Sequence, residues 1–210
     1  MRKIKYLAAI IFSFFIFSRF SFAFDEVSYD IKASFYPEEK KIEASETLKF
    51  KNTSGQDISE IYLRVYPNHK YSKKEKINLY KYATYFRIDP YPKGFDAGKF
   101  SIGSIASGGK ELKFSFEGED QTILKVKLAE PLKNNETFEL SIDFSVTIPH
   151  HIGRFGWHEG TFALNRWYPI LGVLDSKGWH NDPDYLLHMP YISDSAMYKV
   201  KIEMPQEYVL

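Results

Sequence analysis

The stretch FELSIDFSVTI, residues 138 to 148, is the clearest fold signal in this chain. Apolar side chains occupy every second position: Phe138, Leu140, Ile142, Phe144, Val146 and Ile148. Successive side chains of a β-strand point to opposite faces of a sheet, so strict period two gives the strand one apolar face. The stretch therefore predicts a long strand that lies against a core.

Shorter alternating stretches occupy much of the remaining chain. They cover residues 27–35, 42–50, 61–65, 100–102, 112–116, 124–128 and 198–204, and an irregularity is expected near Ser45. Gly, Pro, Asn and charged residues separate them, and the first connections are too short for crossover helices. No amphipathic helix of ten or more residues is convincing, although Asn78–Tyr85 could form a short one. The pattern predicts an all-β fold, an antiparallel β-sandwich or saddle of about seven to nine strands with a long aromatic loop.

The aromatic loop, residues 153–179, lies between two of these predicted strands. It holds all three tryptophans, Trp157, Trp167 and Trp179, together with five glycines. Large rings interleaved with Gly and Pro are typical of an ordered loop, and long ordered loops are usually functional. The rings could form a sugar-stacking platform, or they could fill the core beneath the loop, which is the commoner fate of Trp.

Residues 1–23 have the features of a signal peptide. Arg2, Lys3 and Lys5 precede a mostly apolar run, and Ser21-Phe22-Ala23 places small residues at a cleavage site. A retained membrane anchor is the rival interpretation, but the apolar run is shorter than the roughly 20 residues that span a bilayer. We therefore expect an exported chain, periplasmic or extracellular, with a mature domain at 24–210 and membrane contact only through the signal peptide.

Composition narrows the function classes further. Four of the 28 basic residues lie in the first 23 positions, so the mature chain has 24 basic and 27 acidic residues and a net charge of −3. A near-neutral chain without a basic stripe is not expected to bind nucleic acid. The sequence contains no cysteine, which excludes disulfides, thiol nucleophiles and Cys-type zinc sites.

A lysine- and tyrosine-rich region, residues 69–99, interrupts the strand pattern. It carries five lysines within residues 70–81 alone. The cluster could be a polybasic contact surface or a solvated insertion, and its modest length favours the insertion.

Metal-binding motifs are incomplete in this sequence. His158-Glu159 begins an HExxH zinc motif, but Phe162 stands where the second histidine is required. His150, His151 and His158 could form a metal site with an acid, although isolated loop histidines are usually not ligands. The segment 181–184, Asn-Asp-Pro-Asp, could offer oxygens to calcium but is more typical of a turn.

The chain stops shortly after its last predicted strand. Residues 205–210 end on Tyr208-Val209-Leu210, and an apolar end of this kind is unusual for a natural C-terminus. We therefore expect the chain to be a fragment.

Several short motifs occur in a recognisable order along the mature chain. They are Tyr29-Asp30-Ile31, Tyr66-Pro67-Asn68, Leu128–Leu132 followed by Phe138–Phe144, Arg154-Phe155-Gly156, Trp167-Tyr168-Pro169, Gly178-Trp179 and Tyr198–Pro205. In this order the chain resembles the N-terminal domain of the aminopeptidase N family of zinc metallopeptidases, particularly its exported bacterial members. The likeness covers nearly the whole mature chain.

The resemblance implies a β-saddle domain that packs against a thermolysin-like catalytic domain. In the family, that second domain binds zinc through HExxH and a later Glu and activates a water for attack on the peptide bond. These 210 residues contain none of its motifs, so the resemblance implies no catalytic residue, no cofactor in this chain and no activity of the chain alone. The expected partners are the catalytic domain of the same polypeptide and a peptide substrate.

The resemblance also assigns roles to residues of the aromatic loop. The family's N-terminal domain contributes one Gln or Glu that binds the substrate amine, and Glu159 is the nearest match, ten residues before Pro169. Trp157, Trp167, Tyr168 and Trp179 are expected at the interface with the catalytic domain. The segment 188–190, His-Met-Pro, departs from a Gly-Glu pair of the relatives. The alternative is a free-standing secreted β-sandwich that binds glycan or protein through its Trp-rich loop.

Overall fold

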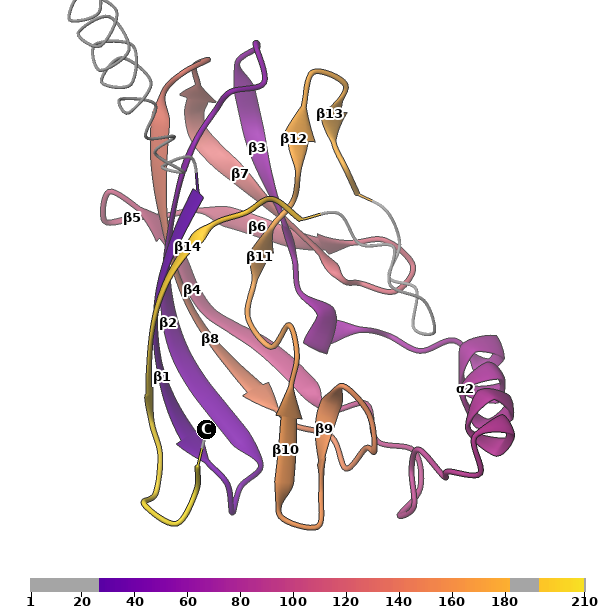
Figure 1. Ribbon diagram of the computed structural model, residues 1–210. Helices are drawn as coiled ribbons and strands as arrows, with labels where there is room; N and C mark the ends of the chain where they lie inside the picture. The colour runs from indigo at the N-terminus through magenta and orange to yellow at the C-terminus, as the bar shows by residue number, and fades with distance from the viewer. Residues whose placement is uncertain (1–26, 182–192, 210) are drawn as a thin grey trace, which may run out of the picture.

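The computed structural model describes residues 27–181 and 193–209 (Figure 1). Two main β-sheets enclose the core, and two short hairpins and one α-helix lie beside them. The predicted signal peptide, most of the 181–184 turn and the 188–190 segment fall outside the described residues. Within the described ranges, no helix is long and apolar enough to cross a membrane.

The larger sheet has six strands in the order β14-β1-β2-β8-β4-β5. Its members are β1 (Val27–Tyr36), β2 (Lys41–Lys51), β4 (Lys99–Ser107), β5 (Lys110–Glu111), β8 (Thr137–Thr147) and β14 (Met197–Glu203). The neighbours within this sheet are antiparallel except β14, which pairs with β1 in parallel. The predicted antiparallel sheet therefore gains a parallel edge strand from the far end of the chain.

The smaller sheet has four strands in the order β11-β3-β7-β6. Its members are β3 (Ile58–Arg64), β6 (Lys113–Glu117), β7 (Ile123–Leu132) and β11 (Ile170–Leu171). Residues 110–117 pass from the larger sheet, as β5, to the smaller one, as β6. The two sheets are thus joined at a corner, and eight of the strands have five or more residues, within the predicted range of seven to nine.

The core lies between the inward faces of the two sheets. On β8 the buried side chains are Leu140, Ile142, Phe144 and Val146, and Ile148 follows them, which confirms the strand predicted from residues 138–148. Leu63, Leu124 and Val126 of the smaller sheet are fully buried opposite. The alternation in the sequence therefore reports true core positions.

The predicted irregularity near Ser45 is wrong. Strand β2 pairs without a shift with both β1 and β8, and Glu46 lies opposite Ile31 and Ile142. The apparent break arises because a carboxyl side chain, 1% exposed, occupies an inward position between Ala44 and Leu48.

The lysine-rich region forms a longer helix than predicted. After a 3-10 turn, η1 (Tyr66–Asn68), the helix α2 covers Lys73–Tyr85, thirteen residues instead of the eight expected. Ser72 and Glu75 form a capping box: the Glu75 amide donates to Ser72 Oγ at 3.2 Å and the Ser72 amide donates to Glu75 Oε2 at 2.7 Å. This local signal starts the helix one turn earlier than the weak apolar periodicity indicated.

The aromatic loop is more regular than expected. It contains a hairpin of β9 (Phe155–His158) and β10 (Thr161–Leu164), the strand β11, and a second hairpin of β12 (Leu174–Asp175) and β13 (Gly178–Trp179). Because β11 pairs with β3, the middle of the loop belongs to the smaller sheet. Short strands of two to four residues carry too little periodicity to be read from sequence.

Candidate functional site

The tip of the β9–β10 hairpin presents Glu159. Glu159 and Gly160 form a two-residue turn with φ of 46° and 79°, as a type I′ hairpin requires. The Glu159 side chain is 85% exposed, and its Oε1 lies 3.6 Å from His158 Nε2. The predicted amine-binding carboxylate therefore stands at an exposed tip, while its role in substrate binding stays a prediction.

Of the three histidines proposed as a metal site, His150 and His158 lie close together, whereas His151 packs elsewhere. The rings of His150 and His158 lie 5.5 Å apart, and both Nδ1 atoms are buried without a hydrogen-bond partner. His151 instead stacks on Tyr91 at 4.6 Å, and its Nδ1 lies 3.1 Å from the Phe155 carbonyl oxygen. Burial lowers the pKa of His151. Among the described residues, no three His, Asp or Glu side chains gather closely enough to hold a metal ion.

The three tryptophans pack against three different parts of the fold. Trp167 is buried in the core beside Phe144, with ring centroids 5.9 Å apart. Trp179 contacts Tyr62 of β3 at 5.7 Å. Trp157 lies on the hairpin, and the loop at the β1–β2 turn places Lys40 Nζ 4.6 Å from its ring. Trp167 is buried, whereas Trp157 and Trp179 are partly buried, and the place of these tryptophans at a domain interface stays a prediction.

An aromatic cavity lies next to the turn that carries Glu159. Its volume is about 340 Å³, and Phe162, Trp167, Met204 and Tyr208 are among the residues that line it, together with Gly160. The centroid of the Phe162 ring lies 6.0 Å from that of Tyr208 and 4.8 Å from that of Phe35 on β1. Volume and apolar lining are in the range of small-ligand pockets.

Tyr168 connects the aromatic loop to the edge of the larger sheet. Its ring lies 5.8 Å from Tyr29 of β1 and 6.1 Å from Tyr198 of β14. Tyr29 stacks on Tyr198 at 4.8 Å, and its hydroxyl accepts a hydrogen bond from the Leu171 amide at 3.0 Å. Burial is the main cause that raises the pKa of both Tyr29 and Tyr168.

Glu46 lies in this same tyrosine-rich part of the core, and sequence reasoning missed it. Both carboxyl oxygens are buried without a hydrogen-bond partner. Burial raises the pKa of Glu46 well above its ordinary value. The negative charge of its carboxylate is a minor cause of the raised pKa of Tyr29 and Tyr168. The sequence signal that could have identified Glu46 is an acidic residue at a core-facing position of the alternating pattern of β2.

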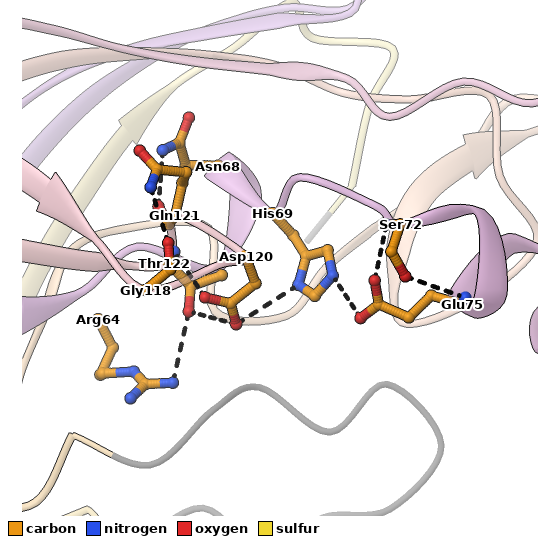
Figure 2. A network of polar contacts seen from close by, with 9 residues as sticks. All are labelled: Arg64, Asn68, His69, Ser72, Glu75, Gly118, Asp120, Gln121 and Thr122. Atoms are coloured by element: carbon orange, nitrogen blue, oxygen red, sulfur yellow. Dashed lines mark hydrogen bonds and ion pairs between the residues drawn. The ribbon is translucent and has the colours of Figure 1, made fainter.

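A second polar cluster joins the end of β3 to helix α2 and the β6–β7 turn (Figure 2). His69 is 3% exposed; its Nε2 donates to Glu75 Oε1 at 3.2 Å, and its Nδ1 lies 4.0 Å from Asp120 Oδ2. Thr122 Oγ1 donates to the Asp120 carboxylate at 2.9 Å and receives a contact from Arg64 Nη2 at 3.5 Å. We name this cluster the His69 network. It fixes the start of helix α2 on the sandwich.

Two arginines contact the ring of Tyr66, and one of them, Arg64, belongs to this network. The Arg166 guanidinium is 3.9 Å from the Tyr66 ring centre, and that of Arg64 is 5.3 Å from it. Arg166 has a φ of 55°, the left-handed region that non-glycine residues rarely adopt. Neither contact was predicted, because the three residues come from β3, η1 and the aromatic loop.

Comparison with known proteins gives structural neighbours only. No family model and no curated protein sequence matches the chain. A two-domain M1 zinc metallopeptidase bound to L-arginine is similar over 87% of this chain and 33% of its own length, with 16% identity and a TM-score of 0.47. The M1 zinc metallopeptidase of Deinococcus radiodurans is similar over 87% and 32%, with 17% identity and a TM-score of 0.46.

Yeast LTA4 hydrolase in complex with bestatin is similar over a smaller region, 58% of this chain and 14% of its own, with 16% identity and a TM-score of 0.35. The chain thus spans a third or less of the length of these solved structures.

Proposed function

We propose that this chain is the N-terminal, non-catalytic domain of an exported zinc aminopeptidase-like metallopeptidase. In this proposal it supports the catalytic domain and lines the substrate site. The ordered motifs of the sequence support the family, and the uncovered inner face of strand β14 supports the role.

Strand β14 extends the core-facing side of the larger sheet beyond the smaller sheet. In its parallel register, Tyr198 lies beside the buried Tyr29 and Val200 beside the buried Ile31. Aligned residues of neighbouring strands face the same side, so Tyr198 and Val200 belong to the core face. They are nevertheless 48% and 49% exposed. An apolar strip continuous with a core and open to solvent fits a second domain that packs against it.

The position of Glu159 is compatible with the role that the resemblance assigns to it. A carboxylate at an exposed hairpin tip can reach a group held by a neighbouring domain. The type I′ turn holds its backbone in one conformation, which favours a fixed presentation of the side chain. In the proposal, Glu159 pairs with the α-amine of a peptide substrate.

In this proposal, zinc is bound by the catalytic domain. The described residues of this chain offer no cluster of three metal-binding side chains, and the His150–His158 pair stands apart from His151.

The alternative function, glycan binding through the aromatic loop, requires a shared platform of rings. Instead, Trp157 contacts Lys40 of the β1–β2 turn, Trp167 packs in the core and Trp179 packs on Tyr62 of β3. A secreted β-sandwich that binds a partner elsewhere on the loop predicts a change in tryptophan fluorescence with an oligosaccharide or protein ligand.

The decisive experiment compares this chain with the product of its full genomic locus. Downstream DNA should encode an HExxH motif within about one domain length, on the order of 100 to 200 residues. The longer product should cleave aminoacyl amides in a chelator-sensitive manner, and the 210-residue chain should not. A stop codon without such a motif in any frame contradicts the proposal.

The interface itself can be tested with two matched substitutions in the longer product. Val200→Glu places a charge on the uncovered strip, whereas Met197→Glu places it on the opposite face of the same strand, at a side chain that is 60% exposed. Val200→Glu should increase protease sensitivity between the domains and reduce activity. Equal effects of the two changes argue against a domain contact at this strip.

A further inference from the structure

Helix α2 presents an outward face that combines lysines with apolar side chains. At 100° per residue, Lys73, Ile77 and Lys81 form one row, flanked by Lys74 and Tyr85. All five are exposed, Ile77 at 46% and Tyr85 at 82%. We name these five residues the basic face. Ile88, three residues beyond the helix, is exposed as well.

Positive charge is concentrated around the basic face. Residues 70–93 contain seven basic and two acidic side chains, a net charge of +5, whereas residues 24–210 as a whole have −3. One of the two acids, Glu75, is turned inward, because its carboxylate is bound by Ser72 and His69. The rest of residues 24–210 therefore carries a net charge of −8, and positive charge is concentrated in residues 70–93.

The helix stands out from the sandwich on the side of the smaller sheet (Figure 1). The His69 network fixes its first turn (Figure 2). Beyond its last turn, Tyr91 is buried and stacks on His151 at 4.6 Å. Ala83 is buried on the inner side of the helix. The basic face is thus held outward by anchors at both ends of the helix.

We propose that the basic face binds the surface of a membrane containing anionic phospholipids. The helix lies in the plane of the interface, Lys73, Lys74 and Lys81 contact the phosphate groups, and Ile77 and Tyr85 enter the boundary between headgroups and acyl chains. Lysines close to an anionic membrane surface are attracted to it, and apolar or aromatic side chains beside them can enter the headgroup boundary. This contact is separate from the predicted signal peptide.

Charge and side-chain chemistry favour lipid over an acidic protein. The apolar residues alternate with lysines along the exposed side of the helix. Lysine is a flexible point charge that follows headgroups, whereas planar bidentate pairing with carboxylates is the property of arginine. Tyrosine, with an apolar body and a polar tip, is enriched at membrane interfaces.

The test measures, by flotation, the partition of residues 24–210 onto phosphatidylcholine vesicles with and without phosphatidylglycerol. The combined substitution Lys73→Gln, Lys74→Gln and Lys81→Gln should reduce partition onto the anionic vesicles about a hundredfold at low salt, since each lysine near such a surface contributes roughly fivefold. High salt should abolish most of the binding, because the contact is screened.

The matched control removes three exposed lysines elsewhere: Lys110→Gln, Lys113→Gln and Lys133→Gln. It has the same net charge and should bind almost as the unchanged chain. Every variant begins at Phe24, so that the apolar and basic residues of the predicted signal peptide do not contribute to vesicle binding.

A second pair of variants tests the apolar contribution. Ile77→Ser should weaken binding severalfold, while Phe114→Ser, at a similarly exposed position on β6, should leave it unchanged. Circular dichroism and tryptophan fluorescence verify that each variant is folded.

Equal partition of the two triple variants, or binding that does not depend on phosphatidylglycerol, overturns the proposal. Binding of soluble polyglutamate that is lost with the helix lysines, in a chain that ignores vesicles, also overturns it and assigns the surface to an acidic polypeptide.

Discussion

Replacing Glu46 with Gln should stabilise the chain progressively as pH rises. The Glu46 carboxyl is 1% exposed, and neither oxygen has a hydrogen-bond partner. Burial raises its pKa in the folded state, because desolvation penalises the charged form. In the unfolded chain the same group has an ordinary carboxyl pKa near 4.5. The folded state therefore binds one more proton than the unfolded state between these two pKa values.

The sign and slope follow from this difference. Below the ordinary carboxyl pKa, both states are protonated and the folded protein keeps the full contribution of the neutral group. As pH rises from the unfolded pKa toward the folded pKa, the free energy of unfolding falls by about 1.4 kcal/mol for each pH unit. Gln has nearly the same shape and does not titrate, so Glu46→Gln removes this loss. The two proteins should be most similar near pH 4.5 and diverge above it.

Urea unfolding followed by tryptophan fluorescence, repeated between pH 4.5 and 8, measures the effect; the lower limit is the ordinary carboxyl pKa. Trp167 reports on the core because it packs on Phe144. Glu43→Gln is the control, since Glu43 lies on the outer face of the same strand and is exposed. A constant difference between Glu46→Gln and the unchanged chain across this range refutes the reasoning. So does an equal pH slope in the Glu43 variant.

Three further substitutions have defined outcomes. Trp167→Ala should destabilise the chain by about 3 to 5 kcal/mol in urea unfolding, because it empties a buried aromatic site. Gly98→Ala should lower Tm by several degrees, since φ is +65° and an added Cβ lies 2.5 Å from the Thr147 carbonyl oxygen. Ser45→Ala should raise the pKa of Asp143 in an NMR titration, because hydrogen bonds from Ser45 and then Ser104 hold it low. The ionised Asp143 carboxyl stabilises the fold above its ordinary pKa, and this stabilisation is lost as pH falls through the folded pKa. Ser45→Ala should therefore lose less free energy of unfolding on acidification than the unchanged chain.

The long strands could be predicted because each has one buried face. On β1 and β8 every inward position is apolar, and period two alone locates the core. On β2 the same rule failed at Glu46, because an acid at an inward position looks like a shift in register. Sequence periodicity cannot distinguish a bulge from a buried polar side chain.

Hydrophobic periodicity could not predict the extent of helix α2 or the pairing of strand β14, for different reasons. The helix begins at a capping box and its first turn is bound to His69, and these polar contacts carry no apolar period. Strand β14 was predicted as a strand, but its parallel partner lies about 170 residues away in sequence. Long-range pairing depends on the whole sandwich.

The interface residues predicted from the resemblance have different structural roles. Trp167 packs within the core, so its removal should act mainly on stability. Tyr168 touches both the buried Tyr29 and the half-exposed Tyr198. Because it spans the core and the uncovered strip of β14, Tyr168 is the residue through which a second domain on that strip would contact the aromatic loop. Loss of domain contact without loss of stability should therefore distinguish changes at Tyr198 from changes at Trp167.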